Sequence, residues 1–178
     1  MKVKLSVCIV AYNNYDDIKE AILSMEKYTS KELPKMIYIV DNGVSISDPN
    51  DVNSFIQFVN EYDDIQYIDV GANLGFGKGH NKVLDIIDSE YHAIVNPDIL
   101  FCEDSFTKIV EWMDMNIEVG MTIPLIIDEQ GNRQQVYREE LTVFDMFNRM
   151  VLKEAFKKRA KQHTLQNMDY TKPFEVPF

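Results

Sequence analysis

The sequence predicts an α/β fold in which a doubly wound, mostly parallel sheet is flanked by helices. Short apolar runs alternate with segments of helical periodicity through residues 5–113. The connections between them are short and rich in Asp, Asn, Gly and Pro. Strict alternation of strands and helices is typical of parallel sheets, because each crossover then carries a helix onto a face of the sheet.

The expected strands are runs of apolar, β-branched and aromatic residues that end at polar residues or glycine. They cover residues 5–12, 36–40, 65–70, 91–95 and 121–127. The first run is almost continuously apolar, which indicates a strand that is covered on both faces. The fourth ends at Asn96-Pro97-Asp98, where proline cannot continue the backbone hydrogen bonding of a sheet. A turn is expected at residues 128–132, after the last run.

The expected helices are marked by apolar residues at i, i+3, i+4 and related spacings. The stripes are Ile18, Ile22 and Met25; Val52, Phe55, Ile56 and Val59; His80, Val83, Leu84 and Ile87; Phe106, Ile109, Val110 and Met113; and Val143, Met146, Phe147, Met150 and Val151. The third stripe follows a glycine-rich loop. The fourth has Glu103, Asp104 or Ser105 available at its N-terminus.

Composition and charge narrow the class of protein. The 178 residues are 46% hydrophobic and 26% charged, as in soluble globular domains. Neither the cysteines nor the histidines have zinc-site spacing, and no segment is apolar enough to cross a bilayer. The N-terminus does not resemble a signal peptide, so we expect a cytoplasmic protein.

The net charge of −11 is distributed unevenly along the chain. Residues 1–148 carry 11 basic and 26 acidic side chains, which argues against nonspecific binding of nucleic acid. Residues 149–178 carry 7 basic and 3 acidic side chains, and the basic ones concentrate in a helical segment over residues 149–161. This segment is either an ordinary helix with a solvated cationic face or a surface that approaches anionic phospholipid.

Polar side chains follow each of the first four expected strands. They lie in residues 11–14, 41–42, 73–81 and 96–98, and in a doubly wound fold such loops converge on one edge of the sheet. We expect Tyr12 to stack on a base and Asp41 to accept a hydrogen bond from it. The glycine loop suits a phosphate, with positive charge added by Lys78 and His80. Asp98 is placed to hold a divalent cation against a diphosphate, although Asn-Pro-Asp is also a common turn signal.

Two other nucleotide-binding classes are disfavoured. Gly75, Gly77 and Gly79 form G-x-G-x-G, but the third glycine comes one position too early for a dinucleotide fingerprint and the loop follows the third strand. A nucleotidyltransferase predicts a glycine-rich, basic loop directly after the first strand. That loop is Ala-Tyr-Asn-Asn instead.

Four motifs in order resemble family 2 of the inverting glycosyltransferases, in particular its rhamnosyltransferase-like branch. They are Val7–Asn13, Ile39–Asn42, Asn73–Asn81 and Asn96–Asp98, and the similarity extends over about residues 3–140. The resemblance implies a GT-A fold, a dTDP- or UDP-sugar donor and a Mg2+ or Mn2+ ion. It also implies a saccharide or lipid-linked acceptor in bacterial polysaccharide synthesis.

The resemblance assigns site residues by position. The implied donor-binding set is Ala11, Tyr12, Asn13, Asp41, Asn42, Asn73, Gly75, Gly79, His80, Asn81, Asn96 and Asp98. Ala11, Tyr12 and Asp41 would contact base and ribose, whereas Asn73, Gly79 and Asn81 would shape the donor loop. Asp98 would be the metal ligand, at the final carboxylate of the family's DXD motif. Asn96 stands where that motif has its first carboxylate.

The catalytic base implied by the family has no counterpart in this sequence. It belongs to an acidic segment that we expect beyond Phe178, and Glu139, Glu140 and Asp145 do not match its position. We therefore expect a nucleotide-sugar-binding domain at 1–140, followed at 141–178 by a basic helix and the start of an acceptor-side region. The alternative is a binding or partner module that retains the pocket without catalysing transfer.

Overall fold

The computed structural model describes residues 3–134 and 173–174. The chain divides into two compact units, Met1–Thr122 and Ile123–Phe178, and the candidate site belongs to the first. Several expectations fall outside the described residues and stay predictions. They are the helical stripe at 143–151, the basic segment 149–161, the boundary at 140, and the carboxylates Glu139, Glu140 and Asp145.

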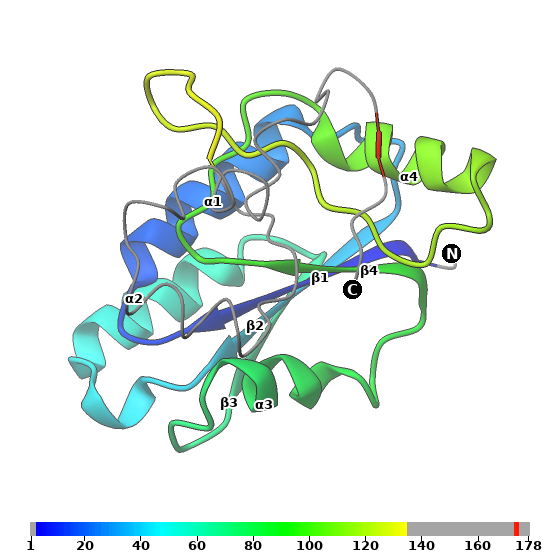
Figure 1. Ribbon diagram of the computed structural model, residues 1–178. Coiled ribbons are helices and arrows are strands. Elements are labelled where there is room, and N and C mark those ends of the chain that lie inside the picture. The colour runs from blue at the N-terminus through cyan, green and yellow to red at the C-terminus, as the bar shows by residue number, and fades with distance from the viewer. Residues whose placement is uncertain (1–2, 135–172, 175–178) are drawn as a thin grey trace, which may run out of the picture. The chain divides into compact units, whose positions relative to one another are not determined.

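A four-stranded parallel sheet forms the centre of the first unit (Figure 1). Its strands are β1 (Val3–Ala11), β2 (Lys35–Asp41), β3 (Ile65–Asp69) and β4 (Ser89–Val95), in the order β3-β2-β1-β4. Ala11 lies opposite Asp41, which lies opposite Asp69, and Val95 lies opposite Ile9. The carboxyl ends of all four strands therefore form one edge. The strand order reverses at β1, and ligands of open α/β sheets bind outside the carboxyl ends near such a reversal.

Helices cover both faces of this sheet (Figure 1). They are α1 (Tyr15–Tyr28), α2 (Pro49–Val59), α3 (Phe76–His80) and α4 (Ser105–Met115), with 3₁₀ turns at Val44–Ile46 and Asn81–Val83. α1, α2 and α4 lie on one face and α3 on the other. The chain moves outward from β1 to β3 and then returns past β1 to β4, so a right-handed crossover places α3 on the opposite face. The predicted doubly wound fold is confirmed.

Alternation along the strands divides the core into two clusters. Odd-numbered residues of β1 and β2, such as Ile9 and Ile39, pack with Ile18, Ile22 and Phe55 from α1 and α2. The smaller cluster, on the α3 face, contains Cys8, Val10, Tyr38, Val40 and Val83. The unequal clusters show that α1, α2 and α4 bury most of the apolar surface, while α3 covers a thinner part of the sheet.

Side-chain caps begin two of the helices. Asp48 accepts a hydrogen bond from the N–H of Asn50 at 2.7 Å, directly before Pro49 opens α2. Asp104 accepts one from the N–H of Thr107 at 3.1 Å and is the N-cap of α4. The structure thus selects Asp104 among the three residues that the sequence offers at this position.

Two element predictions were wrong. The helix expected over His80–Ile87 begins earlier, at Phe76, and passes into a 3₁₀ turn after His80. Residues 121–127 form no extended strand in the described part of the chain, since Pro124 cannot donate to a ladder and Ile127 makes an isolated bridge with Arg133. The turn expected at 128–132 is present, closed by the N–H of Asp128 to the carbonyl of Asn132 at 2.8 Å.

Within residues 3–134 and 173–174, no helix has the length and apolar character that a membrane span requires.

Candidate functional site

The loops that follow β1 and β2 are packed against each other. The N–H of Asn42 donates to the carbonyl of Ala11 at 2.9 Å. A Cβ atom added to Gly43 would lie 2.7 Å from the backbone N of Asn13, so a larger residue there would push the two loops apart. Asn13 itself has a φ of 58°, a left-handed conformation that asparagine tolerates better than most residues. These contacts fix Tyr12 and Asn13 directly beside the end of β2.

The glycine-rich loop is held against the same two strand ends. The side-chain Nδ2 of Asn42 donates to the carbonyl of Gly75 at 3.2 Å. A Cβ on Gly79 would lie 2.9 Å from a γ-carbon of Val10 and 3.3 Å from Nδ2 of Asn42, which explains why this position has no side chain. Asn73 shapes the start of the loop by accepting a hydrogen bond from the N–H of Gly75 at 2.8 Å. Three of the four predicted segments therefore meet at one edge of the sheet.

Asp41 is the buried centre of this arrangement. Its side chain is fully buried, and its Oδ2 accepts hydrogen bonds from the hydroxyls of Tyr15 and Tyr67, both at 2.7 Å. Its Oδ1 accepts from the N–H of Gly43, also at 2.7 Å. Burial, with the neighbouring carboxylate, raises the pKa of Tyr15 to about 12 and that of Tyr67 further, so both hydroxyls keep their protons and donate.

This geometry changes the role expected for Asp41. Oδ2 accepts two hydrogen bonds and Oδ1 one, from α1, β3 and the loop after β2, and the side chain does not reach the surface. In this structure Asp41 therefore offers no exposed oxygen to the base of a nucleotide. Asp41 instead joins α1, β3 and the loop after β2, through Tyr15, Tyr67 and Gly43 respectively.

His80 also differs from its expected role as a source of positive charge. Its side chain is buried at the end of α3, with 4% of its surface exposed, and its ring meets that of Phe76 edge to face at 4.4 Å. Burial, and then the proximity of His92, lowers its pKa below the usual value. The imidazole is therefore neutral near pH 7, and of the two residues expected to supply charge only Lys78 is exposed.

The remaining predicted residues are accessible at or near the edge. Tyr12 is 48% exposed, and Asn81, Asn96 and Asp98 are exposed as well. Because β4 neighbours β1, the turn at 96–98 leaves the sheet beside the loop that follows β1. Phe76, at the start of α3, is 55% exposed and was not expected to take part. Two aromatic rings are thus available to stack on a planar ligand.

A shallow hollow of about 310 Å³ lies beside the first of these loops. It is lined by residues from the loop after β1 and the starts of α1 and α2, namely Asn13, Asn14, Tyr15, Asp16, Asp17, Lys19, Asp51 and Ser54. It adds three carboxylates and two amides to the polar surface near Asn13.

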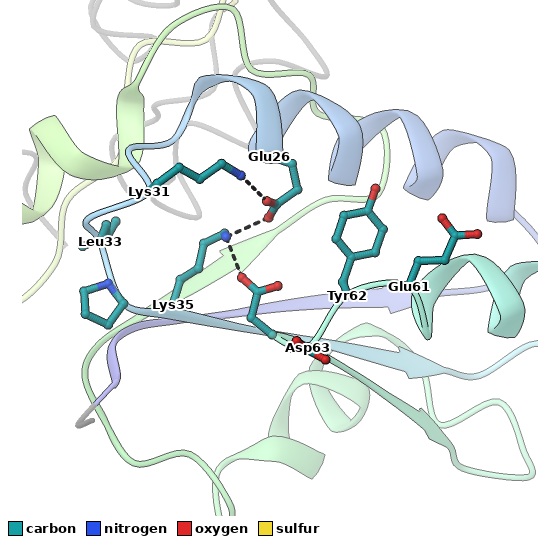
Figure 2. A pocket seen from close by; sticks show the side chains of 9 residues that line it. Glu26, Lys31, Leu33, Lys35, Glu61, Tyr62 and Asp63 are labelled. Atoms are coloured by element: carbon teal, nitrogen blue, oxygen red, sulfur yellow. Dashed lines mark hydrogen bonds and ion pairs between the residues drawn. The ribbon is translucent and has the colours of Figure 1, made fainter.

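A larger hollow, of about 440 Å³, lies at the opposite end of the strands (Figure 2). Lys35, at the start of β2, forms ion pairs with Asp64 at 2.6 Å and Glu26 at 2.7 Å, and Lys31 pairs with Glu26 at 2.9 Å. Burial alone would lower the pKa of Lys35, but its hydrogen bonds to the two carboxylates outweigh burial and raise it. The charges satisfy one another, so we assign this network to holding the turn before β2 against β3.

The donor atoms at the edge fit a weakly held Mg2+ or Mn2+ ion. Asp98 is an exposed carboxylate and Asn96 an exposed amide two residues earlier, both hard oxygen donors. Among the described residues, no three His, Cys, Asp or Glu side chains gather closely enough to hold a metal ion. A cation here would depend on the phosphate oxygens of a ligand and on water for its other contacts, as Mg2+ commonly does.

Sequence reasoning missed Tyr15, Gly43, Tyr67 and Phe76. Tyr15 and Tyr67 had a detectable signal, because strand alternation places Asp41 on the same face as Ile37 and Ile39, where a carboxylate needs donors. Gly43 had none, since its close approach to Asn13 depends on tertiary packing. Phe76 is an aromatic residue within an otherwise small and polar loop, which was itself a signal.

Comparison with known proteins decides the family. A family model described as Glycosyl transferase family 2 matches residues 6–174. The chain belongs to glycosyl transferase family 2. The family 2 chain is also 27% identical over 157 residues to an uncharacterized glycosyltransferase of Methanocaldococcus jannaschii, a match that covers 84% of this chain and 51% of the relative. It therefore spans about half the length of the curated relative that it matches.

Solved structures of glycosyltransferases share the fold of the family 2 chain. S. aureus TarS 1–349 has a TM-score of 0.54 at 18% identity, over 80% of this chain and 42% of that protein. The same protein in complex with UDP-GlcNAc gives 0.52 at 19% identity, over 68% and 37%. A mannosyltransferase from Pyrobaculum calidifontis, in complex with GDP-Man and Mn2+, gives 0.52 at 17% identity, over 62% and 32%. The predicted GT-A fold is confirmed.

Proposed function

We propose that this family 2 chain binds a nucleotide-diphosphate sugar, a dTDP- or UDP-sugar, together with Mg2+ or Mn2+ at the carboxyl edge of its sheet. The observation that carries the proposal is the packing of three strand-end loops around Asn42. This residue is hydrogen-bonded to Ala11 and Gly75, and its side chain lies where a Cβ on Gly79 would approach within 3.3 Å. Exposed aromatic, amide and carboxylate groups surround these contacts. TarS is titled as a complex with UDP-GlcNAc and the mannosyltransferase as one with GDP-Man and Mn2+, which supports this ligand class.

We assign the contacts by chemistry and exposure. Tyr12 stacks on the base and Asn13 offers its exposed amide to the nucleoside, whereas the buried Ala11 contributes by holding Asn42 through its carbonyl. In the glycine loop, the exposed Gly75 leaves backbone accessible to the diphosphate and sugar, and Asn81 lies exposed at the end of the loop. The buried Gly79 lets the loop pack against Val10 and Asn42. Asp41 acts indirectly, by fixing the loop after β2 against α1 and β3.

The proposed reaction is an inverting transfer in bacterial polysaccharide synthesis, with rhamnose as the sugar that the sequence motifs favour. An acceptor hydroxyl attacks the anomeric carbon as the bond from that carbon to the diphosphate oxygen breaks, and a carboxylate base takes the hydroxyl proton. The cation, held by Asp98, supplies charge that stabilises the departing diphosphate. The base is assigned to none of the described residues.

Titration calorimetry tests the binding step. UDP and dTDP are titrated into the 178-residue chain with and without Mn2+, and Asp98→Ala is compared with the parent. We expect binding that Mn2+ strengthens and that loses this strengthening in Asp98→Ala. Asp63→Ala is the matched control, because it removes an exposed carboxylate at the opposite end of the strands (Figure 2). Absence of binding by both nucleotides, with Asp98→Ala indistinguishable from the parent, refutes the proposal.

A second candidate function is nucleotide-sugar binding without transfer. It is favoured by the catalytic base that the family implies, which is assigned to none of the described residues. Release of free sugar from a UDP- or dTDP-sugar, or its transfer to an acceptor, would exclude this candidate. Binding without turnover by the same chain would favour it.

We propose further that the acceptor is a saccharide or a lipid-linked saccharide, met at the cytoplasmic face of a membrane through the basic segment 149–161. Flotation with anionic liposomes tests this contact, with charge reversal at Lys157, Lys158 and Arg159. Association that salt and charge reversal both abolish is the expected result. Association that neither affects would contradict an electrostatic contact.

A further inference from the structure

A polar cluster lies on the α3 face of the sheet, beside the apolar contacts of α3. Ser6 Oγ is 2.7 Å from His92 Nδ1 and 2.7 Å from Ser89 Oγ, which joins β1 to β4. His80, buried at the end of α3 on the same face, is the fourth member of the cluster, and His92 contributes to the lowering of its pKa. The cluster contains two of the three histidines in the chain.

The two imidazoles have unused hydrogen-bonding groups. Three buried ring nitrogens have no hydrogen-bond partner among the described residues: Nδ1 and Nε2 of His80 and Nε2 of His92. A buried polar group without a hydrogen-bond partner destabilises the folded chain. An apolar side chain at position 80 would avoid that cost. The imidazole therefore calls for an explanation other than packing.

The surroundings of His80 accept a neutral ring but not a charged one. β4 presents His92, and the neighbouring helical turns carry the cations Lys78 and Lys82. β1 and β2 contribute Cys8 and Tyr38 to the buried surface of this face, and burial raises the pKa of both, so neither supplies a negative charge.

A proton on His80 would thus create a buried cation among groups that do not compensate it, and such a charge is strongly disfavoured. The strain can be relieved by moving α3 away from the sheet. α3 carries Gly79, which packs against Val10 and Asn42, so this movement would displace the glycine-rich loop.

We propose that His80 is a positioning residue for the glycine-rich loop 73–81 and holds the loop against the sheet only while its imidazole is neutral. Acidification then loosens the loop and weakens binding of a nucleotide diphosphate. The second consequence rests on the proposed function, whereas the first does not. His80 acts through the position of α3 and needs no contact with the ligand.

Amide hydrogen exchange without ligand tests the first consequence. The amides of residues 76–83 are compared at pH 7.5 and 5.5, after correction for the intrinsic pH dependence of exchange. We expect their protection to fall in the wild-type chain at pH 5.5 and to fall by less in His80→Phe, where His92 alone still titrates, with His80→Gln as a second variant that cannot be protonated at position 80. His163→Asn, which removes the third histidine, is the matched control and should behave as wild type. Equal protection at both pH values in the wild-type chain overturns the proposal.

Calorimetry with UDP and Mn2+ tests the second consequence. The quantity compared is the ratio of Kd at pH 5.5 to Kd at pH 7.5, because the terminal phosphate of the nucleotide itself titrates at about pH 6. This ratio should be larger in wild type than in His80→Phe. One proton on His80 can change Kd by at most about tenfold for each pH unit, which sets the upper limit of the difference. Equal ratios overturn the link to binding. No binding by the wild-type chain at pH 7.5 contradicts the proposed function instead, and the exchange experiment still decides the role of His80.

Discussion

Removing one of the three donors to Asp41 should destabilise the sheet-containing unit by a measurable amount. Tyr67→Phe deletes a hydroxyl 2.7 Å from Oδ2 while keeping the ring that contacts Phe55 at 6.1 Å between centroids. Hydrogen bonds to charged groups contribute about 1.5–3 kcal/mol, so we expect the free energy of unfolding to fall by about that amount. Tyr15→Phe should have a similar effect, because its hydroxyl lies at the same distance from the same oxygen.

The double variant gives a stricter test. With both tyrosine hydroxyls gone, Oδ2 of the fully buried Asp41 has lost its two donors and only Oδ1 keeps the N–H of Gly43. The loss in Tyr15→Phe/Tyr67→Phe should therefore exceed the sum of the single losses, as expected for groups that share a partner.

Urea denaturation followed by the fluorescence of Trp112, the single tryptophan of the chain, reports these changes from α4. Tyr12→Phe is the control, since it removes a hydroxyl from a ring that is 48% exposed and should change stability by less than about 0.5 kcal/mol. If Tyr67→Phe also stays within 0.5 kcal/mol of the parent, where about 1.5–3 is expected, Asp41 is not the buried centre that the hydrogen bonds indicate.

Three further predictions concern packing, ion pairing and pH. Gly79→Ala should lower the free energy of unfolding by about 1–3 kcal/mol and weaken nucleotide binding, because its Cβ would lie 2.9 Å from a γ-carbon on β1. Gly77→Ala is the control and should be neutral or stabilising, since no atom lies within 4 Å of the added Cβ. Urea denaturation and calorimetry compare the two variants. Lys35→Ala should cost about 1–3 kcal/mol in urea denaturation, because it leaves the half-buried Asp64 without its partner and Glu26 with Lys31 alone. Nucleotide affinity at the opposite edge should be unchanged. The pKa values of His80 and His92 are lowered in the folded state, so their contribution to stability is complete above about pH 6.5 and declines as the pH falls toward the lowered values. Thermal denaturation from pH 7.5 to 5 should show this decline, and the decline should be smaller in His80→Phe.

The fold was predictable because its signals are local. The apolar run of β1 and the stripe Val52, Phe55 and Val59 of α2 each specify one element, and the alternation of such elements specifies a parallel sheet. The third helix was misplaced because glycine lowers helix propensity, although the contacts of Gly79 with the sheet outweigh that preference. Residues 121–127 were misassigned because an apolar run does not reveal whether a partner strand exists.

The candidate site was predictable as a set of loops but not in the direction of each side chain. Strand ends locate Asp41 and Asp98 at one edge, yet the sequence does not show that Asp41 is buried under two tyrosine hydroxyls while Asp98 is exposed. For His80, the glycine loop suggested a cation near phosphate, whereas packing against Phe76 and the sheet makes it neutral. Such differences depend on tertiary contacts, which spacing along the chain does not encode.

Paramagnetic broadening by Mn2+ tests the central claim most directly, since it maps where a metal-bound nucleotide lies. In amide NMR spectra of the chain with UDP and substoichiometric Mn2+, we predict that signals of residues 96–99, 75–81 and 11–13 broaden together and that Asp98→Ala suppresses the effect. Residues 31–35 and 61–64, around the hollow in Figure 2, should stay sharp. Broadening centred on that hollow, or spread without preference over the surface, would contradict a nucleotide site at the carboxyl edge of the sheet.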